Sequence, residues 1–118
     1  MKKIDQINQW QQRKYKCKEL QKLSEILTNL DIRWIDNSED FGDDLQKDLN
    51  LKCGHGIERI FWILNGKRWS AVNGFGTYGG YLADPEKNKG LIELKIGDAD
   101  LEGYLTAADV IVRMNMKQ

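Results

Sequence analysis

Hydrophobic residues recur at three- and four-residue steps along the first thirty residues, from Ile4 to Leu30. This spacing places them on one face of an α-helix, with lysines and glutamines on the other face. The pattern therefore predicts an amphipathic N-terminal helix of roughly 25 residues. Residues 31–35 then alternate between polar and apolar side chains, which predicts a short strand. In the acidic stretch 37–50, the spacing of the leucines indicates one or two further helical turns.

Two apolar runs, residues 57–64 and 69–72, flank the dipeptide Asn65-Gly66. Asn-Gly tolerates positive φ at both central positions of a type I′ turn, the tightest connection between antiparallel strands. We therefore expect a β-hairpin. A two-residue turn pairs Trp62 with Trp69, Ile60 with Ala71 and Leu64 with Lys67 on one sheet face, and turns Phe61 and Ile63 to the other.

The C-terminal third predicts one more strand and a second helix. Residues 91–96 alternate as a strand with their even-numbered side chains inward. Thr106 and Asp109 have the spacing of a capping box, in which each side chain bonds the backbone N–H of the other residue. Leu105 and Val110 are placed for a hydrophobic staple at the same helix end. The order of elements predicts an α+β fold: an antiparallel sheet of three to four strands around the Asn-Gly hairpin, flanked by an N-terminal and a C-terminal helix.

Length and composition indicate one domain over residues 1–118 with a single packed core. Hydrophobic residues make up 41% of the chain, which argues against long disorder. No apolar run is long enough to span a bilayer, and residues 1–3 lead into a polar helix, so we expect no membrane partner. The two cysteines then indicate reduced thiols and a cytoplasmic location.

Charge is balanced in total, with 18 basic and 18 acidic residues, but it is divided along the chain. Residues 1–25 have a net charge of +4, residues 36–48 of −5, and residues 93–109 of −4. One interpretation is a set of solvated faces that attract one another. The other is a bipolar surface that meets complementary patches on a partner.

Residues 74–79 match the pattern Gly-x-Gly-x-x-Gly. In a dinucleotide fingerprint the third glycine opens a helix whose N-terminus faces the pyrophosphate. Here Asp84-Pro85 follows within a few residues and no amphipathic helix is indicated. We interpret the glycines as positions of positive φ that let the chain leave the hairpin and lay three aromatic residues on the domain: Phe75, Tyr78 and Tyr81.

Cys53 and His55 are the strongest candidates for metal or thiol chemistry, with Cys17 as a third ligand. A structural zinc site needs four ligands, usually in two close pairs, and this chain offers only these three. Cys17 also falls on the apolar stripe of the first helix, where a buried thiol packs well. We therefore expect no metal or other cofactor. The acidic stretch 36–48 also lacks the ligand order of a calcium loop.

Basic and aromatic residues interleave along the hairpin, which is typical of a platform for single-stranded nucleic acid. The alternative interpretation is that its two tryptophans form a cross-strand pair in the core. Both interpretations stay open because the sequence does not show which sheet face is exposed. The residues concerned are Arg59, Phe61, Trp62, Lys67, Arg68, Trp69 and Tyr78.

The C-terminal half resembles small uncharacterised proteins of phages and prophages in Gram-positive bacteria. The likeness rests on residues 53–59 (CGHGIER), 69–80 (WSAVNGFGTYGG), 90–94 (GLIEL) and 103–110 (GYLTAADV). No activity or catalytic residue is carried over from that group. The resemblance implies a context: accessory phage proteins often bind host machinery, including defence systems such as CRISPR–Cas.

The sequence thus predicts a non-catalytic accessory protein that binds and modulates a host protein or defence complex in the bacterial cytoplasm, for example as an anti-CRISPR-like inhibitor. The alternative is a direct binder of single-stranded nucleic acid, and the third reading is a small metal protein or enzyme using Cys53 and His55. The residues expected to contact the partner are Phe75, Tyr78, Tyr81, Trp69, Arg68, Asp43 and Asp44.

Overall fold

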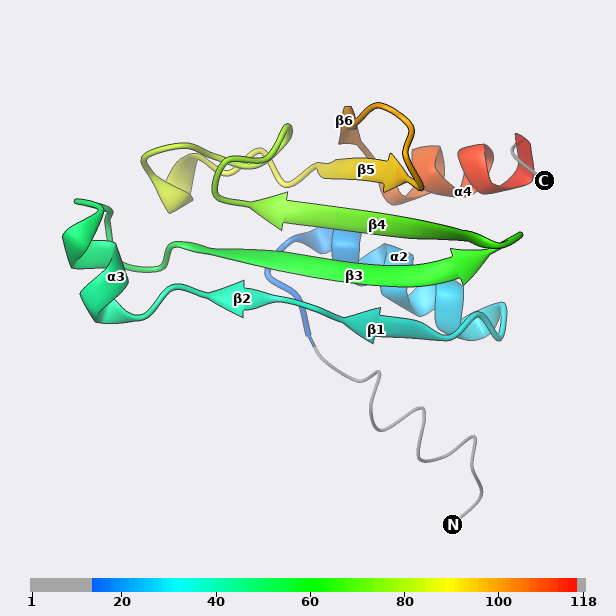
Figure 1. Cartoon of the computed structure of the whole chain (residues 1–118), viewed down its shortest axis with the longest axis horizontal. Coiled ribbons are helices and arrows are strands. Elements are labelled where there is room, and N and C mark those ends of the chain that lie inside the picture. The colour runs from blue at the N-terminus through cyan, green and yellow to red at the C-terminus, as the bar shows by residue number, and fades with distance from the viewer. Residues whose placement is uncertain (1–13, 117–118) are drawn as a thin grey trace, which may run out of the picture.

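The computed structural model describes residues 14–116. It has one antiparallel sheet in the order β1-β3-β4-β5-β6, with the short β2 also paired to β3. Helices α2 and α4 pack against each other on one face of the sheet, and the described residues place no helix on the other face (Figure 1). The elements are α2 (Lys18–Asn29), β1 (Trp34–Asp36), β2 (Glu39–Asp40), α3 (Asp43–Asp48), β3 (Gly56–Leu64), β4 (Lys67–Gly74), the 3-10 turn η1 (Pro85–Lys87), β5 (Ile92–Ile96), β6 (Glu102–Leu105) and α4 (Ala107–Met116).

The predicted hairpin and its register are confirmed. Asn65 and Gly66 have φ of 53° and 76°, as a type I′ turn requires. Trp62 lies opposite Trp69, and their rings stack with centroids 6.0 Å apart. The turn therefore directs both large indoles towards the helices.

The core lies between the sheet and the two helices. The apolar side chains of α2, which recur at three- and four-residue steps, pack against the even-numbered side chains of β5. They meet because both sets are apolar and point into the space between the helices and the sheet. Helix α4 closes the layer with Val110 and Met114. The buried side chains include Leu20, Leu23, Leu27, Trp34, Ile60, Trp62, Trp69, Ala71, Ile92, Leu94 and Val110.

The N-terminal helix is shorter than predicted. It begins at Lys18, and residues 14–17 are not helical; the predicted portion before residue 14 lies outside the described residues. The Glu58 carboxylate on β3 accepts hydrogen bonds from the backbone N–H groups of Lys16 and Cys17, at 2.8 and 3.0 Å. Tyr15 packs against Trp34 with ring centroids 6.1 Å apart. These contacts with the sheet hold the segment extended where the apolar spacing alone favours a helix.

The prediction of three to four strands is too low, because the sheet has six strands within residues 14–116. The four predicted strands are present, and β2 and β6 are additional. Strand β2 has two residues, both exposed, so it carries no apolar alternation. Strand β6 contains Gly103 and a left-handed residue, Tyr104, which are typical of turns rather than strands.

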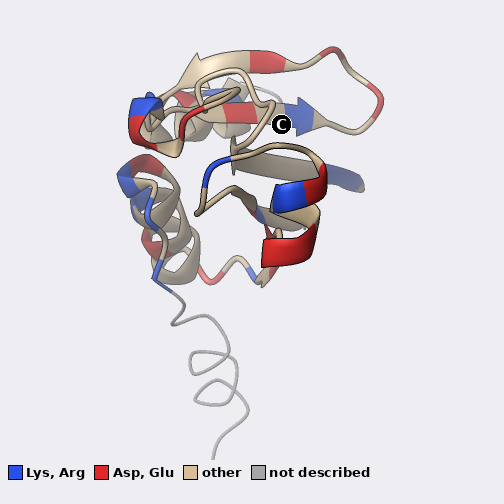
Figure 2. Ribbon diagram, turned by 90° about the vertical axis from the view of Figure 1, so that its left-hand side faces the viewer, with Lys and Arg blue, Asp and Glu red and all other residues tan. Residues whose placement is uncertain are grey.

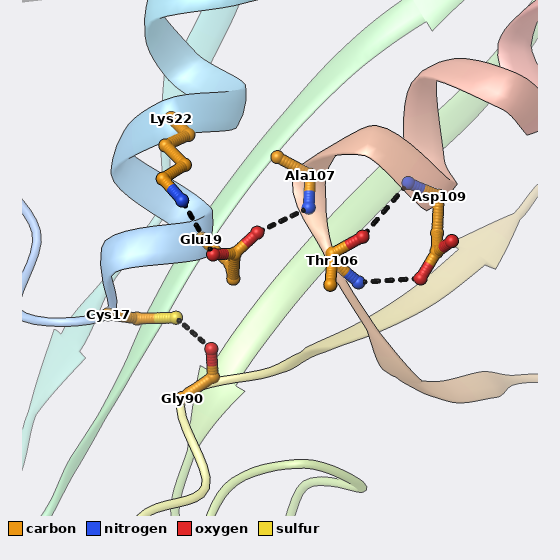
Figure 3. Close-up of polar contacts among 7 residues, drawn as sticks. All are labelled: Cys17, Glu19, Lys22, Gly90, Thr106, Ala107 and Asp109. Carbon is orange, nitrogen blue, oxygen red and sulfur yellow. Dashed lines mark hydrogen bonds and ion pairs between the residues drawn. The ribbon is translucent and has the colours of Figure 1, made fainter.

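The predicted cap of the C-terminal helix is confirmed (Figure 3). Thr106 Oγ1 accepts from the N–H of Asp109, and the Asp109 carboxylate accepts from the N–H of Thr106, at 3.2 and 2.9 Å. A third acceptor comes from the other helix: Glu19 Oε1 lies 2.9 Å from the N–H of Ala107. This bond from the Ala107 backbone lowers the pKa of the Glu19 carboxyl, with a smaller contribution from Lys22. Helix α2 thus caps helix α4.

The turn gives the first test. Gly66→Val should lower the free energy of unfolding by more than about 1 kcal/mol, because a β-branched residue resists the left-handed conformation. Urea denaturation measures the change. Asn65→Gly is the control and should be nearly neutral, since glycine also adopts positive φ. Equal stability of Gly66→Val and the wild type would contradict the role of the turn.

The cap gives a pH-dependent test. A carboxyl whose pKa is lowered on folding stabilises the protein above its unfolded pKa, and this stabilisation is lost as the pH falls through the folded pKa. Glu19→Gln should therefore be less stable than the wild type at neutral pH, and the difference should shrink in acid below the ordinary glutamate range. Urea midpoints at several pH values measure it, with the exposed Glu86→Gln as control. A difference that persists unchanged in acid would show that charge on Glu19 is not involved.

Candidate functional site

The long connection after the hairpin is held by one buried side chain, Asn73, at the end of β4. Its amide nitrogen donates to the carbonyls of Gly79 and Leu91 and to Asn88 Oδ1, at 3.3, 2.9 and 2.9 Å. Its own oxygen accepts from Asn88 Nδ2 at 2.7 Å. Asn73 therefore fixes the beginning and the end of the loop, so that the loop presents its side chains in a defined arrangement.

This loop brings two exposed tyrosines together. Tyr78 from the loop and Tyr104 from β6 are 55% and 53% exposed, with ring centroids 6.3 Å apart. The Tyr104 N–H donates to the Tyr78 carbonyl at 3.3 Å, which joins the two backbones. The Lys89 ammonium lies 5.2 Å from the centroid of the Tyr104 ring. We call Tyr78, Tyr104 and Lys89 the tyrosine pair with its lysine.

The backbone under this pair is strained. Tyr104 has φ of +61°, a conformation that costs a residue with a Cβ about 1–2 kcal/mol. The other non-glycine residues with positive φ are Asp and Asn, which tolerate it better. At the preceding position a Cβ would overlap the Tyr78 side chain, so only glycine fits at Gly103. Strain concentrated under exposed aromatic rings is a pattern associated with functional sites.

The sheet face opposite the helices also carries accessible apolar and basic groups. Phe61 and Ile63 point to this face, as predicted, and Ile63 is 60% exposed. The Arg68 guanidinium lies 3.9 Å from the centre of the Phe61 ring. Lys95 is opposite Ser70 on the neighbouring strands and is also exposed. We call this surface, with Phe61, Ile63, Arg68 and Lys95, the open face.

Two residues expected to contact a partner are buried. Trp69 is 2% exposed because the hairpin register turns it into the core. Tyr81 is buried because its hydroxyl accepts from the Gly56 N–H at 3.1 Å and its ring packs edge-on against His55. Phe75 is half-buried, between Phe41 and His55. These three aromatic residues support the loop from within, and of the loop aromatics Tyr78 is the exposed one.

The acidic candidates lie on a separate element. Asp43 and Asp44 are exposed in the first turn of α3, where the helix dipole favours negative charge (Figure 2). The predicted helical turns in this stretch are thus confirmed. Within residues 14–116 no hydrogen bond or ion pair joins these carboxylates to the tyrosine pair or to Arg68.

The glycine pattern of residues 74–79 forms a folded loop. Its last glycine begins no helix; instead Phe75 bridges to Tyr81, and the Gly76 N–H donates to the Tyr81 carbonyl at 2.8 Å. Gly74, Gly76 and Gly79 all have positive φ, as expected. The loop therefore lacks the helix N-terminus that a dinucleotide fingerprint requires.

The cysteines and the histidine occupy different environments. Cys17 is buried, its thiol donates to the Gly90 carbonyl at 3.4 Å, and burial raises the pKa of that thiol (Figure 3). Cys53 is exposed. His55 is buried, with Nδ1 2.5 Å from the Lys52 carbonyl oxygen. Among the described side chains, no group of three or more His, Cys, Asp or Glu could hold a metal ion.

Sequence reasoning missed Tyr104 and Lys89. Tyr104 belongs to the strand that was not predicted, and only the adjacent Gly103 indicates an unusual backbone there. Lys89 reaches the site through the loop anchored by Asn73, a contact that the sequence does not show.

No protein-family model matches this chain, and neither the curated proteins nor the solved structures give a match. None of the helices in residues 14–116 has the length and apolar character needed to cross a membrane.

The strained tyrosine can be tested by substitution. Tyr104→Asn should change the free energy of unfolding by less than about 1 kcal/mol, because relief of left-handed strain offsets the lost ring contact. Phe75→Ala is the comparison and should be clearly destabilising, since Phe75 packs against two rings. A large loss of stability in Tyr104→Asn would assign Tyr104 a structural role.

Proposed function

We propose that this protein is a non-catalytic binding protein that recognises a partner protein through the open face and the tyrosine pair with its lysine. The observation that carries the proposal is a sheet that, within residues 14–116, is covered by helices on one face, with the exposed side chains of Ile63, Arg68 and Lys95 beside the half-buried Phe61 on the other. Tyrosine and arginine are among the residues that most often dominate binding energy at interface centres.

Charge indicates the kind of surface that the partner presents. Arg68, Lys95 and Lys89 are exposed around the open face, whereas Glu93 on the same face is buried and accepts from the Tyr78 N–H at 3.3 Å. A complementary partner surface is therefore acidic around an apolar centre. We retain the acidic α3 segment, with Asp43 and Asp44, as a second contact for a basic region of the partner.

The resemblance to phage and prophage proteins supports the context. We propose that the partner is a host protein or a defence complex in the bacterial cytoplasm and that the chain modulates it, as an anti-CRISPR-like inhibitor does. Two of the three candidate groups have environments that support a non-catalytic role: the Cys17 thiol is buried with a raised pKa, and the His55 ring is enclosed by aromatic residues, whereas Cys53 is exposed.

Single-stranded nucleic acid is the second candidate. It is favoured by one observation, the contact of a cation with an aromatic ring at two places: Arg68 over Phe61 and Lys89 over Tyr104. Proteins that bind single strands combine stacking rings with positive charge in this way.

The test is a pull-down from host lysate with and without nuclease. We expect a protein partner that survives nuclease and whose affinity falls by about 30-fold in Tyr78→Ala, equivalent to about 2 kcal/mol. Val112→Ala, an exposed apolar residue on α4, is the control and should bind normally. Thermal melting of Tyr78→Ala should match the wild type.

Two outcomes would contradict the protein-binding proposal. If nuclease removes all captured material and labelled single-stranded oligonucleotides bind directly, the second candidate is correct. If Tyr78→Ala binds as the wild type does, the tyrosine pair is not the contact. Charge reversal at Asp43 and Asp44 tests α3 separately: unchanged affinity and salt dependence would exclude the acidic segment from recognition.

A further inference from the structure

The sequence contains the dipeptide Asn-Gly twice, at Asn65-Gly66 and at Asn73-Gly74. Asparagine before glycine is especially prone to spontaneous deamidation, because glycine has no Cβ to hinder attack of its backbone nitrogen on the asparagine side chain. One copy precedes β4 and the other ends it, so the two copies lie at opposite ends of the sheet (Figure 1). The same chemistry therefore meets two different environments in one chain.

At the hairpin turn, Asn65 and Gly66 are free to react. Both residues are exposed, and among the described residues neither the Asn65 side chain nor the Gly66 N–H has a hydrogen-bond partner. A Cβ built at Gly66 would meet nothing within 4 Å. The pairing that closes the turn joins Leu64 to Lys67, outside the reacting peptide. The Gly66 nitrogen can therefore reach the Asn65 side chain through rotation of one exposed peptide.

At the other copy, both reacting groups are held. Asn73 is 1% exposed, and its side-chain amide makes the four hydrogen bonds that anchor the loop after β4. The Gly74 N–H is also engaged, because it donates to Thr77 Oγ1 at 3.0 Å. A Cβ built at Gly74 would overlap the Gly56 carbonyl, so the backbone is closely packed there. Deamidation of Asn73 therefore requires local unfolding.

We propose that Asn65 is a site of spontaneous deamidation in the folded protein and that the fold protects Asn73. The Gly66 nitrogen loses its proton and forms a bond to Asn65 Cγ, the bond from Cγ to Nδ2 breaks, and ammonia leaves with the proton. Water then opens the resulting succinimide. Opening at Cγ gives aspartate, and opening at the backbone carbonyl carbon of residue 65 gives isoaspartate. The net change is the gain of one water and the loss of one ammonia, with no oxidation or reduction.

The two products have different effects on the hairpin. Aspartate before glycine also favours a type I′ turn, so the aspartyl form keeps the register. In isoaspartate the main chain runs through Cβ and Cγ, which adds one atom to the connection between the strands. That longer connection no longer fits the two-residue turn that pairs Leu64 with Lys67 and sets Trp62 opposite Trp69. The isoaspartyl form is therefore destabilised.

Ageing of the full chain in mildly alkaline buffer, followed by peptide mapping with mass spectrometry, tests the site. We expect deamidation of Asn65 at least about tenfold faster than that of Asn73, because Asn73 must first lose its buried hydrogen bonds. In urea the two asparagines should react at similar rates, since the fold and not the dipeptide separates them. Asn65→Gly removes the reacting amide while keeping a residue that adopts positive φ, so it should gain no modification at the turn.

Thermal melting of the separated products tests the effect on the hairpin. Both products add one negative charge and can be separated from the unmodified protein by ion exchange. We expect the isoaspartyl form to melt at a lower temperature than the wild type. Asn65→Asp is the matched control, because it carries the same added charge on a normal backbone, and it should melt close to the wild type.

Three results would overturn the proposal. They are the absence of product at Asn65 in the folded protein, equal rates at Asn65 and Asn73 in the folded protein, and an isoaspartyl form that melts as the wild type does. None of these results bears on the pull-down, because the partner-binding surface is tested there through Tyr78.

Discussion

The two-residue turn at Asn65-Gly66 determines the arrangement of the rest of the structure. Side chains alternate along a strand, so shifting the hairpin by one residue would turn Trp62 and Trp69 outward and Phe61 inward. The observed register gives α2 and α4 an apolar face to cover, and β1 and β5 continue that face on either side. The same register creates the open face, so the core and the proposed binding surface have a common origin.

Carboxylates on one element accept hydrogen bonds from backbone N–H groups at the start of the next helix, and these bonds hold the helices in place. The Glu58 carboxylate on β3 accepts hydrogen bonds from the backbone N–H groups of Lys16 and Cys17, which precede α2. The Glu19 carboxylate on α2 accepts a hydrogen bond from the N–H of Ala107, the first residue of α4. Helix starts leave backbone N–H groups unsatisfied, and here the N–H groups of Cys17 and Ala107 are bonded by carboxylates distant in the chain. The position of α4 therefore depends on α2, and that of α2 depends on the hairpin.

Features set by local chemistry could be predicted from the sequence. Asn65-Gly66 specifies its turn through backbone preference, and Thr106 with Asp109 specifies a helix start through a spacing of three residues. Features set by distant partners could not: residues 14–17 are held extended by Glu58, and Tyr81 is buried through Gly56 and His55. The same distinction applies to the candidate site. Tyr78 could be predicted because it lies in a glycine-rich loop that the sequence shows. Tyr104 could not, because only long-range strand pairing brings it next to Tyr78.

The irregular outer strands also restrict how a partner can bind. One edge of the sheet is divided between β1 and β2, of three and two residues, and the other is β6, where the left-handed Tyr104 interrupts the strand next to a register shift. An edge of this kind offers no continuous row of free N–H and C=O groups to an added strand. Recruitment by β-augmentation, and the self-association that follows from it, is therefore disfavoured. Under the proposed function, recognition then depends on side chains, so that single substitutions on the open face would change the choice of partner without changing the fold.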